Sequence, residues 1–288
     1  MPTLRQIRRR IRSIQNTAKV TRAMEMVAAT KMRRAQQATL AGRPYAQRIQ
    51  EITGHLAAQP LREEEVPPLL RQRPVRRVEV VLLTPDRGLC GALPANLNRT
   101  ALRFLLEQTA PTSVIAVGRK GRDFMARYRR DLRAVFTGLG DRPTVAALSP
   151  IVRLVVDDFT SGYADAVYLI YPQFVNTMVQ RPVVQQLLPV APTSLPPASR
   201  VGYIYEPRDL SVLLSALLLR YLESQIYHAV LESLASEHSA RMVAMRNATE
   251  NAKALVQELT LLANKVRQES ITKELLDIIG GTWALRAR

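Results

Sequence analysis

The stretch that decides the fold is Arg208–Ile279, RDLSVLLSALLLRYLESQIYHAVLESLASEHSARMVAMRNATENAKALVQELTLLANKVRQESITKELLDII, which contains neither proline nor glycine over 72 residues. The N-terminal stretch Thr3–Ala41, TLRQIRRRIRSIQNTAKVTRAMEMVAATKMRRAQQATLA, also lacks both. Of the chain's 18 prolines and 12 glycines, 24 lie between Pro60 and Pro207. One helix of 72 residues would be about 108 Å long at 1.5 Å per residue, far longer than a typical globular helix. We therefore expect a long helix at each end and a differently built centre.

Apolar residues in both stretches recur at heptad spacing. They are Leu4, Ile7, Ile11, Ile14 and Ala18 near the N-terminus, and Leu210, Leu214, Leu217, Tyr221, Leu255, Leu259, Leu262 and Val266 near the C-terminus. This spacing gives a helix one apolar seam that faces one partner helix. Between Ser233 and Ala254 the seam is rich in alanine, which would let two backbones approach closely. We predict that the two helices pack against each other as an antiparallel pair.

The centre of the chain alternates between short β-branched runs and helical patterns. Strands are predicted at Val78–Thr84, Ser113–Val117, Ala134–Thr137 and Ala166–Tyr171, and helices at Ala95–Glu107, Arg119–Arg130 and Val145–Phe159. This alternation predicts a parallel α/β sheet. We predict three parts: residues 1–74 as N-terminal helix and linker, 75–195 as the α/β domain, and 196–288 as linker and C-terminal helix.

Charge and composition restrict the class of protein. The chain carries a formal net charge of +17, and residues 1–50 hold 12 Lys/Arg against the single acid Glu25. Such a stretch favours an anionic partner: nucleic acid, anionic lipid or an acidic protein surface. The longest nearly unbroken apolar run, Val212–Leu219, has 8 residues, whereas a membrane span needs about 20. The single Cys90 excludes an internal disulfide and favours a reducing compartment.

No group of residues predicts catalysis. The loops Thr84–Asn98 and Val117–Gly121 each join a strand to a helix, as a nucleotide-binding turn does, but neither matches a phosphate-binding glycine motif. Cys90 lies near Arg87 and a helix start, which would favour a thiolate, yet none of the three histidines lies near it in sequence. We expect a buried structural thiol. A nucleic-acid-binding α/β protein and a nucleotide-dependent enzyme remain open as alternatives.

Motifs at both ends and in the centre resemble one family, the gamma subunit of F-type ATP synthases. Asn16–Gln37 (NTAKVTRAMEMVAATKMRRAQQ) resembles the family's N-terminal helix, and Asp86–Gly91 (DRGLCG) resembles its central motif. Leu222–Thr249 (LESQIYHAVLESLASEHSARMVAMRNAT) and Asn264–Gly281 (NKVRQESITKELLDIIGG) resemble its C-terminal helix. The matches lie in order and span nearly the whole chain.

The resemblance implies both a fold and a function. The implied fold is a long antiparallel coiled coil of the N- and C-terminal helices plus a central Rossmann-like α/β domain. The implied function is that of a central-stalk rotor subunit in a proton-translocating synthase, which couples rotation of the membrane c ring to ATP synthesis or hydrolysis in an alpha–beta hexamer. Implied partners are three alpha and three beta subunits, the epsilon subunit and the c ring. No cofactor, catalytic residue, nucleic acid or direct membrane insertion is expected.

The resemblance also implies contact residues and a location. Those near beta subunits are Met24, Arg241, Arg267, Gln268 and Thr272, and those near the c ring are Tyr203 and Glu206. Some residues depart from the family pattern: Pro85 replaces a small polar residue, Ala92 a frequent glycine, and Thr282–Arg288 (TWALRAR) a small apolar tail. With Cys90 as the only cysteine, the cysteine-bearing insertion of the chloroplast form is absent. We therefore expect a peripheral protein on the cytoplasmic face of a bacterial cell membrane.

Overall fold

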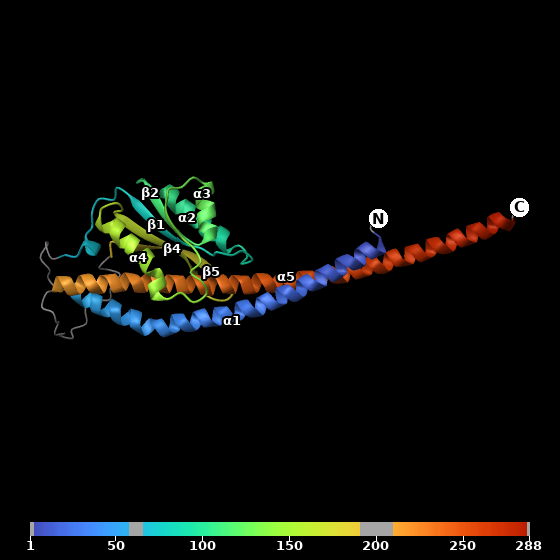
Figure 1. Ribbon diagram of the computed structural model, residues 1–288, viewed down its shortest axis with the longest axis horizontal. Helices are drawn as coiled ribbons and strands as arrows, with labels where there is room; N and C mark the ends of the chain where they lie inside the picture. The colour runs from blue at the N-terminus through green and yellow to red at the C-terminus, as the bar shows by residue number, and fades with distance from the viewer. Residues whose placement is uncertain (1–2, 58–65, 191–209, 287–288) are drawn as a thin grey trace. The chain divides into compact units, whose positions relative to one another are not determined.

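A computed structural model describes residues 3–57, 66–190 and 210–286 (Figure 1). Its elements in chain order are α1 (Leu4–Ala57), the 3₁₀ turn η2 (Pro68–Leu70), β1 (Val78–Leu83), α2 (Leu93–Glu107), β2 (Thr112–Val117), α3 (Arg119–Arg127), β3 (Leu132–Phe136), α4 (Val145–Thr160), β4 (Ala166–Phe174), β5 (Gln180–Leu188) and α5 (Leu210–Arg286). The chain divides into two compact units, residues 1–27 with 242–288, and residues 28–241. The predicted fold class, two long terminal helices and a central α/β domain, is confirmed.

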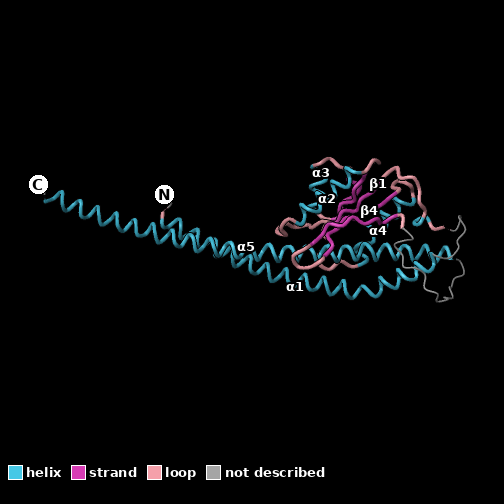
Figure 2. Tube along the Cα trace, turned by 180° about the vertical axis from the view of Figure 1, so that it is seen from behind, coloured by secondary structure: helices cyan, strands magenta, loops and turns pink. Residues whose placement is uncertain are grey.

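The five strands form one sheet in the order β3-β2-β1-β4-β5; the strands are magenta in Figure 2. The first four strands are parallel, with β1 in the centre, and β5 runs antiparallel to β4. Alternate residues of β1 face opposite sides: Val80 and Leu82 pack with α2 and α3, whereas Val81 and Leu83 pack with α4. Helices on both faces explain why β1 is apolar at almost every position and does not alternate.

The sequence predictions for the centre are right in type and differ in detail. All four predicted strands exist, and α2, α3 and α4 match the predicted helices to within a few residues at each end. The fifth strand was missed. Its sequence, QRPVVQQLL, contains Pro182 and three glutamines, and most of its side chains are only partly buried. An edge strand tolerates such a composition, so periodicity does not reveal it.

Both long helices extend beyond their predicted ends. Helix α1 continues past Gly42, Pro44 and Gly54 to Ala57, and α5 continues past the last predicted residue, Ile279, to Arg286. Tertiary packing outweighs the helix-breaking tendency in α1. A Cβ atom on Gly42 would lie 3.4 Å from Cε1 of His228, so a small residue suits this close approach.

The core of the second unit joins the terminal helices to the sheet. Ile49 and Leu56 of α1 belong to one cluster of buried side chains with Leu214 and Leu218 of α5, together with the α4 face of the sheet. No helix within the described ranges is long and apolar enough to span a membrane.

Candidate functional site

Within the first unit, α1 and α5 run antiparallel. The hydroxyl oxygens of Thr21 and Thr249 lie 2.7 Å apart. Glu25, four residues after Thr21 on α1, accepts a hydrogen bond of 3.1 Å from Nε of Arg246. Arg246 lies three residues before Thr249 on α5. Towards the start of α1, Ile7 packs with residues further along α5. Residue numbers rise on one helix as they fall on the other, which confirms the predicted antiparallel pair.

The same register holds within the second unit, where Gly42 lies against His228. The two numbers sum to 270, as do those of Thr21 and Thr249. Each of these two contacts fixes the register of the helix pair within its own unit.

The predicted seam is correct in α1 and partly wrong in α5. Leu4, Ile7, Ile11 and Ile14 all pack against α5. On α5, Leu214, Tyr221 and Leu259 are buried as predicted, but Leu255 and Leu262 are 37% and 40% exposed. Val266 is partly buried, also as predicted, whereas Val256 and Ala263 take the places of Leu255 and Leu262, and Ala252 is buried as well. Small alanines bring the helices close together, so the seam follows them and not the larger leucines one position away.

The pair also buries one charged group. Glu25 is only 5% exposed and takes hydrogen bonds from Arg22, one turn along α1, and from Arg246 across the pair. Burial alone would raise the pKa of Glu25, but the hydrogen bonds and charges of Arg246 and Arg22 outweigh it, so the pKa is lowered. A carboxylate fixed in this way specifies which part of α1 lies beside which part of α5.

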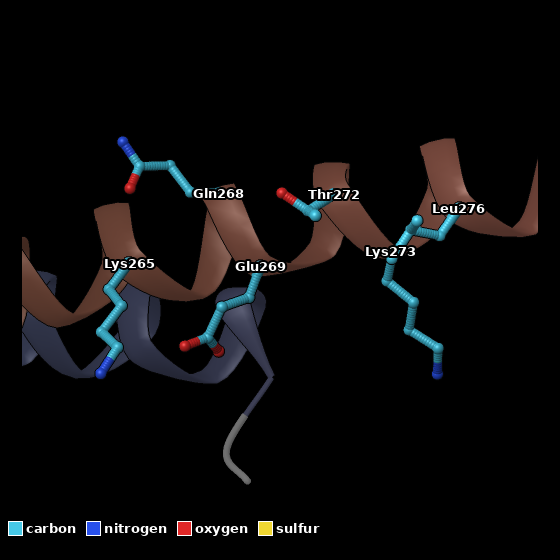
Figure 3. A pocket seen from close by; sticks show the side chains of 6 residues that line it. All are labelled: Lys265, Gln268, Glu269, Thr272, Lys273 and Leu276. Carbon is cyan, nitrogen blue, oxygen red and sulfur yellow. The ribbon is translucent and has the colours of Figure 1, made fainter.

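Beyond Val266, α5 has no α1 residue beside it, because α1 begins at Leu4 in the same cluster. Every residue from 267 to 279 is exposed. This segment carries the predicted contact residues Arg267, Gln268 and Thr272. In Figure 3, Gln268 and Thr272 project to one side of α5, while Lys265, Glu269 and Lys273 project to the other. With Leu276 these five line a hollow of about 470 Å³.

The other predicted contact residues have different surroundings. Met24 is partly buried on α1. Arg241 points into the second unit: its side chain is 12% exposed and pairs with Glu237, and it donates hydrogen bonds to Nδ1 of His238 and the carbonyl of Gly88. Tyr203 and Glu206 lie outside the described residues. The contact assignments therefore remain predictions.

A buried histidine extends the network around Arg241. Nε2 of His238 lies 3.2 Å from Oδ1 of Asp141, and Nζ of Lys31 lies 2.7 Å from Oδ2 of the same carboxylate. Burial and the nearby Arg241 lower the pKa of His238 to about 4. The network joins α1, α5 and the loop before α4. Sequence reasoning missed it because Lys31, Asp141 and His238 lie far apart in the chain and share no local pattern.

Of the two loops considered as nucleotide-binding turns, the second, which leads into α3, is closed by a side chain of the first. Asp86 accepts hydrogen bonds from the backbone N–H of Arg119, at the start of α3, and from that of Gly138, both at 2.9 Å. A phosphate would need the helix start that this carboxylate occupies. Gly118 has a φ of 107°, and a Cβ atom there would lie 1.9 Å from the carbonyl oxygen of Thr84.

Cys90 is a buried thiol. It is 1% exposed, and burial raises its pKa, which is opposite to what a nucleophilic cysteine requires. Within the described ranges, no three Cys, His, Asp or Glu side chains come together as a metal site.

Comparison with known proteins matches the chain over its full length. The family model described as ATP synthase matches residues 3–285. The ATP synthase gamma chain of Dehalococcoides mccartyi is 56% identical over 285 residues, covering 99% of this chain and 100% of the relative. This chain belongs to the ATP synthase gamma-chain family. The gamma chain of Roseiflexus castenholzii is 52% identical over 289 residues, covering 99% of each chain.

Solved structures agree with the family assignment. A chain of the Tetrahymena thermophila mitochondrial ATP synthase central stalk and c ring has a TM-score of 0.61 at 28% identity, covering 80% of this chain and 99% of that one. A chain of the Euglena gracilis enzyme has a TM-score of 0.67 at 21% identity, covering 99% and 95%, and shows the shared fold. The prediction of a central-stalk rotor subunit is confirmed, and this gamma chain is a subunit of the ATP synthase complex.

Proposed function

We propose that this gamma chain couples rotation of a membrane-embedded c ring to ATP synthesis or hydrolysis in a hexamer of three alpha and three beta subunits. The observation that carries the proposal is the antiparallel α1–α5 pair, whose register is unbroken within each unit. A rotor must transmit torque, and two helices locked in register resist sliding along each other. Fixed polar contacts such as Glu25–Arg246 add to this resistance.

The unpaired segment of α5 suits a surrounding partner. Between residues 267 and 279 it exposes Ile271, Leu275, Leu276, Ile278 and Ile279, each at 50% or more. A helix surface with this many exposed apolar side chains favours burial against surrounding protein subunits. In this proposal Arg267, Gln268 and Thr272 contact beta subunits. Met24 and Arg241 contact them through the paired part.

The remaining partners follow from the family. Residues 75–195 would lie near the epsilon subunit and the c ring, with Tyr203 and Glu206 close to the ring, and residues 1–74 and 196–288 would form the shaft. The chain itself is proposed to be non-catalytic, supported by the Asp86 carboxylate at the start of α3. The proposed location is the cytoplasmic face of a bacterial cell membrane, as a peripheral protein.

Co-expression with the alpha and beta subunits of the same synthase tests the proposal. We expect one complex with ATPase activity on gel filtration, and separate elution of the chain would contradict it. The variant Arg267→Ala/Gln268→Ala/Thr272→Ala should lower the turnover of that complex. A control variant, Arg99→Ala/Arg103→Ala, removes exposed charges from α2 and should leave turnover unchanged. Equal turnover of the two variants would refute the assigned contacts.

A further inference from the structure

Glu79 is an ionisable residue in a strand whose other residues are all apolar. It lies in the central strand β1 and is 0% exposed. By the alternation of β1 it faces the same side as Val81 and Leu83, which pack against α4. An ionised carboxylate in such a place costs several kcal/mol unless donors or cations compensate it.

Among the described residues, none donates a hydrogen bond to the carboxyl group of Glu79. Neither of its carboxyl oxygens has a hydrogen-bond partner within the described residues, and the buried hydroxyl of Ser113 has none either. Ser113 is its register partner on β2, and the partner on β4 is Val167. The charged group that Glu79 faces from α4 is another carboxylate, Asp158.

Asp158 forms a two-pronged salt bridge with Arg133 of β3. Nε and Nη2 of Arg133 donate to the two oxygens of Asp158 at 2.9 and 2.8 Å. The guanidinium of Arg133 also lies 4.4 Å from the ring centroid of Tyr163, and that of Arg77 lies 4.5 Å from the same ring. Asp158 is 4% exposed, whereas the side chain of Arg133 is 39% exposed and reaches the solvent.

Two buried carboxylates that face each other with one bound arginine cannot both be charged without a large cost. A protonated Glu79, in contrast, has an O–H group that can donate a hydrogen bond to an ionised Asp158. We propose that Glu79 and Asp158 form a binding site for a single proton, in which Glu79 carries the proton and donates it in a hydrogen bond to Asp158. Release of this proton above neutral pH weakens the attachment of α4 to the sheet.

The electrostatics agree with this geometry. Burial, followed by the charge of Asp158, raises the pKa of Glu79 to about 8, and Arg133 only partly opposes this. In the unfolded chain the carboxyl ionises at its ordinary pKa of 4.5. The folded chain therefore binds one more proton than the unfolded chain between these values. This contribution to stability is complete below pH 4.5 and is lost as the pH rises through about 8.

The test compares the full chain with Glu79→Gln at pH 6 and pH 9. Glutamine keeps the shape and an N–H donor for Asp158 but cannot ionise. Urea unfolding of the α/β domain can be followed by pulsed alkylation of Cys90, the single, buried thiol of this domain. Between these pH values the unfolding constant of the wild type should rise roughly a hundredfold more than that of the variant. Glu107→Gln, at an exposed position of α2, is the matched control and should follow the wild type.

Parallel pH dependence of the wild type and Glu79→Gln would overturn the proposal. If that variant does not fold, carbon-13 labelling of glutamate carboxyls in the wild-type chain decides the question by NMR. One glutamate should then titrate near pH 8. Titration of every glutamate below pH 6 would overturn the proposal equally.

Discussion

A disulfide between α1 and α5 should form when Thr21 and Thr249 are both replaced by cysteine. Their hydroxyl oxygens are 2.7 Å apart, so the two side chains point towards each other across the pair, as a disulfide requires. The bond would close a loop between positions 228 apart in sequence. In the chain-entropy model, a loop of this length corresponds to a stabilisation of about 5 kcal/mol, an upper value because strain reduces it.

The assay uses oxidation of the purified chain followed by non-reducing electrophoresis and thermal unfolding with and without reductant. Because both cysteines belong to one rotor subunit, the oxidised chain should still support ATP hydrolysis in the reconstituted complex. Thr21→Cys/Val256→Cys is the control: Val256 lies seven residues further along α5, about 10 Å at 1.5 Å per residue, so it is out of reach. Equal cross-linking of the two variants would refute the register. Loss of hydrolysis on oxidation, restored by reductant, would refute the view that the two helices turn as one body.

Three further changes test other parts of the structure. Asp86→Ala removes the acceptor for the N–H groups of Arg119 and Gly138 and should destabilise the α/β domain by about 1–3 kcal/mol in urea unfolding; unchanged stability would contradict this. The pKa of His238 is lowered from 6.5 to about 4, so the folded chain keeps this side chain neutral at neutral pH. Its contribution to the free energy of unfolding should be present above pH 6.5 and lost as the pH falls towards 4. His238→Gln should flatten this loss of stability in an acid titration, and an equally steep loss would argue against it. Glu25→Ala should raise amide exchange rates around residues 21–28 and 246–250, because it removes hydrogen bonds from two arginines. The free energy of opening these segments should fall by about 1–2 kcal/mol. Unaltered exchange would show that the buried carboxylate is not stabilising.

Much of the fold follows from local features of the sequence. The absence of proline and glycine predicts the two terminal helices, and short β-branched runs predict the four parallel strands. Strand β5 was missed because its polar edge position leaves no periodic pattern. The true end of α1 was missed because packing of Ile49 and Leu56 into the core compensates for Gly42 and Pro44. The α5 seam was misplaced by one position at Leu255 and Leu262 only, because close helix packing selects Ala263 over the larger Leu262.

Less of the site follows from local sequence. Arg267, Gln268 and Thr272 were named from a family resemblance, and the structure places them together on the unpaired segment of α5. Arg241 was named in the same way, yet its interactions with His238 and Gly88 depend on contacts distant in the chain. The pairing of Glu79 with Asp158 also needs three dimensions, because strand β1 and helix α4 supply one carboxyl each. Sequence spacing reveals groups on one element, whereas these clusters combine several.

Rotation of single molecules tests the central claim most directly. Alpha and beta subunits of the same synthase would be fixed to a surface, assembled with this chain, and a bead attached through a cysteine introduced at Arg99, an exposed position of α2. We predict that the bead turns in one direction when ATP is added and stops when ATP is removed. ATP hydrolysis by the assembled complex without any turning of the bead would contradict the account.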